Sequence, residues 1–329
     1  MFGVHNKKKS DIINGKTYKT IEDAIEYESN TFNFNTSQIF THGPRFRRKN
    51  KIDYKKVKKV CSENDIKLFV HGSYPTIGLW SILDYPEKLE TNINHIIDSM
   101  LSCIKLNASG LVIHLSKKPL IVIKDCFKIL EDHILEHKES KQLLKCQILL
   151  ESPAMAPTKH TFETPEKLNN LCYDIKNSKL KWGLCIDTAH LWCGGIELNN
   201  NLAWNEWLNS LTKFTKNKIK LYHLNGALKS SFKTGKDTHI IPFSNEDAIW
   251  NRFLSKEVKS LLSEQHPLNI EAIVNNITKK EINKIKNSSF YNIITQSKKH
   301  NIPIIFEINR GTDIDVKFCM ALTSYLFKN

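Results

Sequence analysis

Six short apolar segments of the sequence end in a side chain that can bind a divalent metal. These side chains are His71, His114, Glu151, Asp187, His223 and Glu307. Three more follow in connecting segments: His190 stands three residues after Asp187, and Asp237 and His239 lie within Gly235-Lys-Asp-Thr-His239. The set comprises five histidines and four carboxylates. Nitrogen and oxygen donors of this kind suit zinc or manganese.

Nine candidate ligands are too many for one tetrahedral zinc and indicate a cluster of two or three metal ions with shared carboxylates. Any single member could be a hydrogen-bonded structural residue. Six of them at six apolar segment ends are improbable as an accident, so the joint pattern is informative. The other histidines do not share the pattern and are expected mostly at the surface, with His5 and His42 as candidates for the same rim. They are residues 5, 42, 95, 133, 137, 160, 266 and 300.

The elements that must position these side chains are eight short apolar runs separated by segments with helical periodicity. The runs are almost continuously apolar, which is typical of parallel strands buried on both faces. We expect strands at residues 2–5, 37–40, 68–71, 111–114, 148–151, 182–187, 219–223 and 303–307. We expect helices at residues 21–28, 53–64, 84–107, 121–138, 163–177, 203–217, 245–263, 279–300 and 313–327.

Eightfold alternation of strand and helix predicts an α/β fold, a single (β/α)₈ TIM barrel over residues 1–329, whose metal site lies where the carboxyl ends of the strands converge. An open doubly wound sheet is the competitor, but no glycine-rich phosphate loop follows any strand. The connection from about 240 to 302 is longer than one helix requires. We expect a helical elaboration at about 245–300, with two helical stretches joined through residues 264–268.

Composition limits the class of protein and its partners. The 329 residues are 40% hydrophobic and 25% charged, which is ordinary for a globular chain. The formal net charge of +14 fits a polyanionic partner, and it fits a solvated lysine-rich surface equally well. No apolar stretch is long enough for a signal peptide or a membrane span, which predicts an intracellular protein without a membrane partner.

The eight cysteines contain no Cys-x-x-Cys pair. This spacing favours a reducing compartment over a disulfide framework. Cys103, Cys126 and Cys146 lie in segments with apolar periodicity. We therefore interpret them as small core residues without a catalytic role.

Several motifs resemble, in their order along the chain, those of the endonuclease IV (AP endonuclease 2) family. The most specific is Cys185-Ile-Asp-Thr-Ala-His190, followed by His223-Leu-Asn225 and Asp237-Thr-His239. The others are Val70-His-Gly-Ser-Tyr74, Val112-Ile-His-Leu115, Glu151-Ser-Pro153 and Phe306-Glu307. The Met1-Phe-Gly start, the Gly43-Pro-Arg45 turn and Ile186–Trp192 are most similar to members in large DNA viruses. The Asn- and Lys-rich composition agrees with an A·T-rich genome.

The resemblance implies an apurinic/apyrimidinic endonuclease of DNA base excision repair. Such an enzyme hydrolyses the phosphodiester 5′ to an abasic site, leaving a 3′-hydroxyl and a 5′-deoxyribose phosphate, and a 3′-repair activity is left open. It also implies three Zn²⁺ ions, with Mn²⁺ as a substitute. The implied ligand sets are His71, His114 and Glu151; Glu151, Asp187, His223 and Glu307; and His190, Asp237 and His239. Glu151 is then the bridging carboxylate, and a metal-bound hydroxide is the nucleophile.

The implied partner is double-stranded DNA containing abasic sites, bound by a monomer. The implied location is the host cytoplasm or nucleus, and for a viral protein also the virion. An abasic site has no base edge, so recognition should rest on shape and ease of extrusion. By resemblance, Arg45, Tyr74 and Pro75 would contact the DNA. Without it, Tyr74 would be a packed loop aromatic and Arg45 a simple phosphate contact.

Three departures from the family pattern affect the expected DNA contacts and leave the candidate metal ligands unchanged. Pro75 replaces a Leu-like wedge after Tyr74. Asn225-Gly226 replaces Asn-Asp, which removes an acceptor near His223. Residues 240–243 read Ile-Ile-Pro-Phe where the family has a glycine-containing turn.

Two other functions fit parts of the pattern. A metal-dependent sugar isomerase or epimerase would use the same barrel and rim, but typically with fewer metals. A non-catalytic DNA-binding or virion protein would be expected to have lost ligands, and all nine are present. Both are weaker than the nuclease interpretation.

Overall fold

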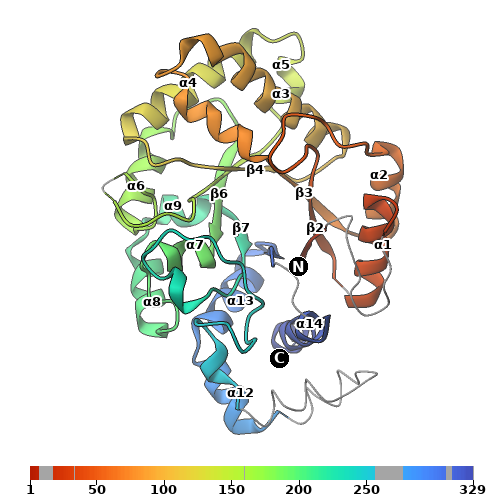
Figure 1. Ribbon diagram of the computed structural model, residues 1–329, viewed down its shortest axis with the longest axis vertical. Helices are drawn as coiled ribbons and strands as arrows, with labels where there is room; N and C mark the ends of the chain where they lie inside the picture. The colour runs from red at the N-terminus through yellow and green to blue at the C-terminus, as the bar shows by residue number, and fades with distance from the viewer. Residues whose placement is uncertain (7–17, 33, 159, 256–276, 309–312, 329) are drawn as a thin grey trace.

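Eight parallel strands close into a barrel that is surrounded by helices (Figure 1). The structure is a computed structural model that describes residues 1–6, 18–32, 34–158, 160–255, 277–308 and 313–328. The strands follow one another around the barrel in sequence order, and the first strand pairs with the last. The predicted (β/α)₈ fold is therefore confirmed.

The strand predictions agree with the structure to within one residue at each end. Five have the expected bounds; the second and third begin one residue earlier, and the last is one residue shorter at each end. The strands are β1 (Phe2–His5), β2 (Thr36–Phe40), β3 (Lys67–His71), β4 (Leu111–His114), β5 (Ile148–Glu151), β6 (Trp182–Asp187), β7 (Ile219–His223) and β8 (Ile304–Phe306).

The described helices cover the outside of this barrel. The α-helices are α1 (Ile21–Phe32), α2 (Tyr54–Glu63), α3 (Leu89–Lys105), α4 (Leu120–Glu136), α5 (Ser140–Leu143), α6 (Pro165–Asp174), α7 (Thr188–Cys193), α8 (Asn201–Ser210), α9 (Lys213–Lys218), α12 (Lys279–Lys286), α13 (Ser289–His300) and α14 (Asp313–Lys328). The short 3₁₀ helices are η1 (Tyr74–Ser81), η2 (Pro86–Lys88), η3 (Lys229–Ser231) and η4 (Asn251–Phe253).

Two segments expected as single helices are each divided in two by a capping residue. Thr212 interrupts the segment 203–217 and caps α9 by accepting from the backbone of Thr215. Ser288 interrupts 279–300 and caps α13 by accepting from the backbone of Tyr291. Hydroxyl side chains at these positions bond the free N–H groups of a new helix and so favour a restart.

The helix expected at 245–263 is wrong for its described part. Residues 245–255 form turns and the short η4. The Asp247 carboxylate accepts from the backbone N–H groups of Phe243, Ile249 and Trp250, and it thereby holds the chain in a turn. The rest of that expected helix and the junction at 264–268 lie outside the described residues.

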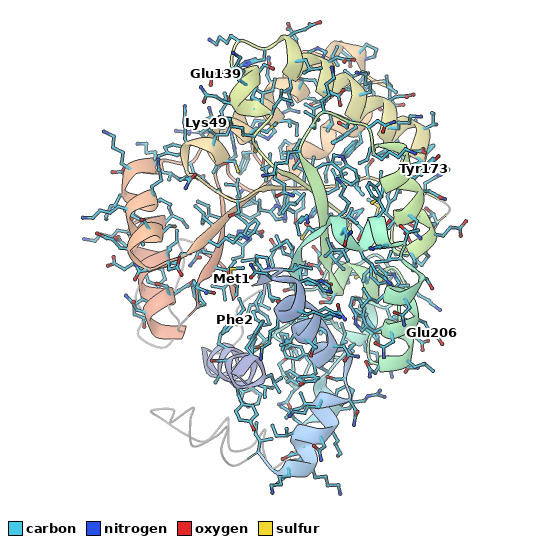
Figure 2. All side chains as sticks on the ribbon, turned by 180° about the vertical axis from the view of Figure 1, so that it is seen from behind. Met1, Phe2, Lys49, Glu139, Tyr173 and Glu206 are labelled. Atoms are coloured by element: carbon cyan, nitrogen blue, oxygen red, sulfur yellow. The ribbon has the colours of Figure 1, made fainter. Side chains whose placement is uncertain are left out.

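The barrel interior contains a small inner layer of side chains, separate from the larger core between strands and helices. The layer consists of Phe69, Val112, Leu149, Cys185, Leu221 and Ile305. In Figure 2 side chains fill the central part of the molecule, while Glu139, Tyr173 and Glu206 lie at its outer edge. All eight cysteines are buried and free, as expected for core residues. Among the described helices, none has the length and apolar character that crossing a membrane requires.

Candidate metal centre

The six predicted ligands at strand ends share one position relative to the inner layer. Each stands two residues after one of its members, as His71 follows Phe69 and Glu151 follows Leu149. Side chains two apart on a strand point to the same face. All six therefore point into the barrel mouth at the carboxyl ends of the strands.

The first group of candidate ligands is His71, His114 and Glu151. Glu151 Oε2 lies 3.4 Å from His71 Nε2 and 3.2 Å from His114 Nε2. These three atoms are buried, and none has a hydrogen-bond partner among the described residues. Buried polar atoms without partners are costly, so their convergence fits a bound cation that would satisfy all three.

The second group is Glu151, Asp187, His223 and Glu307. His223 Nδ1 lies 2.9 Å from Glu151 Oε1, 3.2 Å from Glu307 Oε2 and 3.6 Å from Asp187 Oδ2. Glu151 contributes Oε1 to this group, whereas it contributes Oε2 to the first group. Its carboxylate is therefore placed to link the two groups, as expected of a bridging ligand.

The third group contains His190 and His239, whose Nε2 atoms lie 3.3 Å apart. Asp237 Oδ1 is 2.9 Å from His239 Nε2 and 3.7 Å from His190 Nε2. Asp187 Oδ2 also lies 3.7 Å from His239 Nε2, so Asp187 joins this group as well as the second. His190 is in the first turn of α7, which was expected to be a loop; Asp187 caps this helix by accepting from the backbone of His190.

Backbone carbonyls fix which ring nitrogen of three histidines faces the centre. Nδ1 of His71 donates to Gly72 O at 2.8 Å, and Nδ1 of His239 donates to Glu307 O at 2.7 Å. Nδ1 of His190 lies 2.8 Å from Ser152 O. Because Nδ1 carries the proton in each case, Nε2 is left as the donor for a metal. This is the usual arrangement around histidine ligands.

The side chain of Gln38 in β2 fixes the orientation of the His223 ring, as the backbone carbonyls do for the other three histidines. Sequence reasoning did not identify Gln38. His223 Nε2 donates to Gln38 Oε1 at 3.0 Å, which leaves Nδ1 facing the carboxylates. The Gln38 amide nitrogen donates to Glu307 Oε1 at 3.3 Å and lies 2.9 Å from His5 Nδ1. His5 is thus at the rim, 2.9 Å from Glu307 Oε1. A glutamine within a buried strand was the available signal for Gln38.

Opposite charges balance one another inside the centre. Burial alone would lower the pKa of His190, but Asp187 and Asp237 raise it to about 10. The same carboxylates raise the pKa of His239 to about 9 against the effect of burial. Burial opposes the ionisation of Glu151, yet the neighbouring histidines hold its pKa well below the usual range. Protons on these histidines neutralise the carboxylates, and divalent metal ions would replace them.

Two of the three predicted DNA contacts line the mouth of the centre. Arg45 and Tyr74 line a cavity of about 350 Å³ with His71, His114 and Glu307. Their loops are joined, because the Tyr74 N–H donates to Pro44 O at 2.8 Å.

Phe46 lies beside Arg45 and has 67% of its surface exposed, against 48% for Tyr74. Pro75 does not line this cavity and instead lies in the first turn of η1. Its placement at the start of a helix follows from the fixed φ of proline.

The sequence departures at 225–226 and 240–243 belong to one local structure. Gly226 pairs with Ile240 through two backbone hydrogen bonds. A side chain at 226 would have its Cβ only 2.6 Å from Asp247 Oδ1, so Asp247 occupies the space that a residue larger than glycine would need. The Asn225 amide still donates to Asp187 Oδ2 at 2.7 Å. Asp247 thus fills the space beside Gly226, and its oxygens accept from backbone N–H groups of the same connection.

Replacement of Asp247 by alanine is expected to lower the free energy of unfolding by about 3 kcal/mol or more, because a buried donor left without an acceptor costs roughly 1–3 kcal/mol. The fully buried carboxylate accepts from four backbone N–H groups, those of residues 227, 243, 249 and 250. Urea unfolding would measure the loss. Asp132→Ala on the exposed side of α4 is the control, and a change below about 1 kcal/mol for Asp247→Ala would contradict the prediction.

Two further buried residues, His95 and Cys185, carry groups that can bind a metal, and the burial of His95 differs from the sequence-based expectation of a surface position. His95 is buried, not at the surface, and its ring packs against His42 at 4.8 Å between centroids. Burial and the neighbouring His42 lower the pKa of His95 to about 4. Cys185 lies near Glu151 and His223, but burial raises the pKa of its thiol. A neutral thiol in the inner layer is a core residue and a poor metal ligand.

Comparison with known proteins identifies relatives over most of the chain. A probable AP endonuclease of African swine fever virus is 26% identical over 307 residues, which is 91% of this chain and 87% of that protein. A probable endonuclease 4 of Finegoldia magna is 26% identical over 227 residues, covering 68% of this chain and 75% of that protein. These names confirm the predicted resemblance to the endonuclease IV family and its viral members, and the expectation of an enzyme.

Solved structures show the same fold. The crystal structure of AsfvAP:AG superposes with a TM-score of 0.74 at 23% identity and covers 100% of this chain and 98% of its own. Endonuclease IV from Thermus thermophilus superposes with a TM-score of 0.65 at 15% identity, covering 99% and 98%. The model of the family described as the xylose isomerase-like TIM barrel matches residues 27–273. Because this match spans well over half of the 329 residues, the chain belongs to the xylose isomerase-like TIM barrel family.

Proposed function

We propose that the protein is a zinc-dependent AP endonuclease, which hydrolyses the phosphodiester bond on the 5′ side of an abasic nucleotide in duplex DNA. The observation that supports this most is the convergence of three groups of metal-ligating atoms in one barrel mouth, with Glu151 and Asp187 each shared between two groups. Relatives named AP endonuclease and endonuclease 4 support the same activity.

The donor set fits three zinc ions. His71, His114 and Glu151 would hold one, and Glu151, Asp187, His223 and Glu307 a second. His190, His239 and Asp237 would hold the third, with Asp187 placed to join them. When bound, zinc activates water at neutral pH and stabilises negative charge on phosphate oxygens.

The chain's own residues would fix this geometry before DNA binds. The shared carboxylates of Glu151 and Asp187 set the spacing between neighbouring groups. The carbonyls of Gly72, Ser152 and Glu307 hold the histidine rings in one orientation. Preorganisation of this kind reduces the reorganisation needed in the transition state. Arg45 at the cavity wall would attract the phosphate backbone.

The size of the cavity supports an extruded abasic nucleotide as the substrate. About 350 Å³ accommodates a sugar with its phosphate, and duplex DNA is far wider than the opening. A nucleotide without a base lacks pairing and stacking, so its extrusion costs little. Tyr74 at the cavity wall and exposed Phe46, the residue after Arg45, would fill the space that the abasic nucleotide vacates.

Incision of a defined substrate tests the proposal. A duplex with one tetrahydrofuran abasic analogue is incubated beside an intact duplex, and the ends of the products are identified. We expect cleavage of the abasic strand alone, with a 3′-hydroxyl on the upstream fragment. An uncut strand that is still bound would favour a non-catalytic DNA-binding protein. Absence of both cutting and binding would favour the sugar-isomerase function that the barrel also permits.

Gln38→Leu is expected to reduce incision by about 10–100-fold, the range typical of lost partners to histidine ligands. Leucine keeps the volume but gives His223 Nε2 no acceptor, so the ring can turn away from the carboxylates. Zinc affinity should fall in parallel, and excess zinc should partly restore the rate. Both are measurable by competition with a zinc-binding dye and by gel assay. A variant with wild-type zinc affinity would contradict a positioning role for Gln38.

Phe46→Ala and Tyr74→Ala are each expected to weaken binding of the abasic duplex by about 10-fold or more, because stacking on an aromatic side chain contributes roughly 1–3 kcal/mol per base. Fluorescence anisotropy with a labelled duplex gives the dissociation constant. Tyr173→Ala is the matched control, since Tyr173 is 64% exposed and lies at the outer edge of the molecule (Figure 2). Equal affinities for all three variants would show that neither aromatic enters the DNA.

A further inference from the structure

A second cavity lies at the opposite end of the barrel from the metal centre. It has a volume of about 690 Å³ and is bordered by the amino-terminal ends of strands, including Lys67 of β3 and Lys220 of β7. We call it the basal pocket. Lys67 and His71 are the first and last residues of β3, so the two sites are separated by roughly 13 Å at about 3.3 Å per residue.

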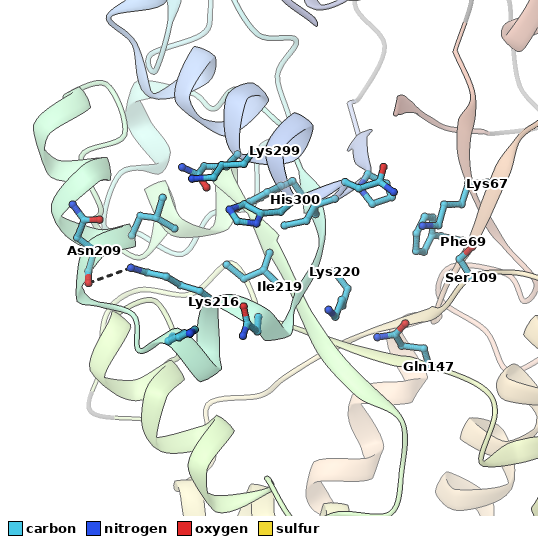
Figure 3. Close-up of a pocket in the computed structure, with 18 residues that line it drawn as sticks. Lys67, Phe69, Ser109, Gln147, Asn209, Lys216, Ile219, Lys220, Lys299 and His300 are labelled. Carbon is cyan, nitrogen blue, oxygen red and sulfur yellow. Dashed lines mark hydrogen bonds between the residues drawn. The ribbon is translucent and has the colours of Figure 1, made fainter.

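The basal pocket is positively charged on several sides. Its lining includes Lys67, Lys213, Lys216, Lys220 and Lys299, and no carboxylate is among its lining residues. In Figure 3, Lys67 lies on one side of the pocket, while Lys216 and Lys299 lie on the other. Within the described part of the chain, none of the five forms an ion pair, whereas other lysines such as Lys56, Lys128 and Lys167 do.

Lys67 and Lys220, from two strands of the barrel, are close enough for their like charges to repel. Lys67 is half-buried at the start of β3, and both its burial and the nearby Lys220 lower its pKa. Convergent lysines without a counterion store repulsion that a bound anion would relieve. The five lysines come from two strands and two helices, β3, β7, α9 and α13, and they meet around one cavity.

The rest of the lining suits a small organic group better than a second protein. Phe69, buried within the barrel, lies beside Lys67 on one wall, and Ile219 and Tyr222 also line the pocket. Gln147 and Asn209 add amide groups. Apolar walls with a few polar groups and a volume of about 300–1,000 Å³ are typical of small-molecule sites. A DNA duplex cannot enter a cavity of this volume.

We propose that the basal pocket binds a small molecule that carries several phosphate groups, of the nucleoside triphosphate or inorganic polyphosphate class. The phosphates contact the converging lysines, and in a nucleotide the base occupies the remaining volume between the amide and apolar groups of the lining. The positive charges of the five lysines are sufficient to neutralise a triphosphate group, whose charge is about −4. The site faces away from the metal centre, so it can be filled while DNA occupies the other end of the barrel.

Isothermal titration of the metal-loaded protein with ATP, inorganic tripolyphosphate and adenosine tests this. We expect ATP and tripolyphosphate to bind and adenosine not to bind measurably. Tighter binding of ATP than of tripolyphosphate assigns the site to nucleotides, and equal affinity assigns it to polyphosphate in general. Binding of adenosine as tight as that of ATP, or no binding of either phosphate compound, overturns the proposal.

Variants locate the binding. Lys67→Gln/Lys220→Gln is expected to weaken ATP binding at least 10-fold, while Lys141→Gln/Lys145→Gln, which removes two exposed lysines outside the pocket, leaves it unchanged. Both double variants should incise abasic DNA at the wild-type rate, which verifies their folding. Equal ATP affinity in the two double variants overturns the proposal.

Two further titrations separate this pocket from the metal centre. His114→Ala, in which the first ligand group is incomplete, is expected to bind ATP with wild-type affinity. Saturating abasic duplex should not displace ATP from the wild-type protein. Loss of ATP binding in His114→Ala, or displacement by the duplex, would place the phosphates at the metal centre and overturn the proposal.

Discussion

Glu151→Gln is expected to reduce incision of abasic DNA by about 10⁴-fold, which corresponds to roughly 5.5 kcal/mol at about 1.36 kcal/mol per factor of ten. Both oxygens of Glu151 are used: Oε2 faces His71 and His114, and Oε1 faces His223. Glutamine keeps the shape but removes the negative charge. One of its ends is an NH₂ group, which cannot bind a metal, so at least one ligand group becomes incomplete.

The measurement is single-turnover incision of the tetrahydrofuran duplex, with the zinc content determined by mass spectrometry. Glu131→Gln is a matched control: Glu131 is also a buried carboxylate, but it lies on α4 and accepts from the backbone of Lys179. It should keep its zinc and its rate. An incision rate for Glu151→Gln within tenfold of the wild type would show that Glu151 is not the bridging carboxylate.

Prolonged chelation is expected to abolish incision, by at least 10³-fold, and zinc should restore it whereas magnesium should not. Five of the nine candidate ligands are histidines, and imidazole nitrogen suits zinc while magnesium prefers oxygen ligands. Full activity after verified removal of zinc, or recovery with magnesium alone, would contradict the proposed cofactor.

Removal of the metals should also lower stability. A ligand at a thousandfold excess over its dissociation constant stabilises the folded state by about 4 kcal/mol. The thermal unfolding midpoint of the wild type should therefore fall on chelation. Glu151→Gln is the control here, because a variant that binds less zinc should show a smaller shift. Equal shifts in both proteins would indicate that the chelator acts elsewhere.

The sequence by itself determined the barrel and the converging ligands. Buried parallel strands must be apolar along nearly their whole length, and this local requirement located all eight strands to within a residue. The alternation of side chains along a strand then placed His71, Asp187 and Glu307 on the inner face. Because parallel strands in a barrel end at one rim, their convergence followed from topology alone.

The residues that cap helices and the burial of individual histidines were harder to predict from the sequence. The divisions at Thr212 and Ser288 depend on single hydroxyl side chains, which the apolar periodicity does not reveal. The α7 helix begins directly after β6 because Asp187 both faces the centre and caps the helix. His95 is buried and contacts His42 from the loop after β2 and Ser73 from the loop after β3, which no local pattern shows.

Only the tertiary structure decided what surrounds the ligands. Gln38 and His223 are 185 residues apart, and closure of the barrel alone brings them to 3.0 Å. Asp247 fills the space beside Gly226 because the connection after β7 folds back on itself, and the basal pocket gathers lysines from two strands and two helices. Periodicity records which face of its own element a residue occupies. The side chains that a residue contacts on other elements depend on how those elements pack against one another. The packing therefore sets the orientation of the histidines and the charge of the basal pocket.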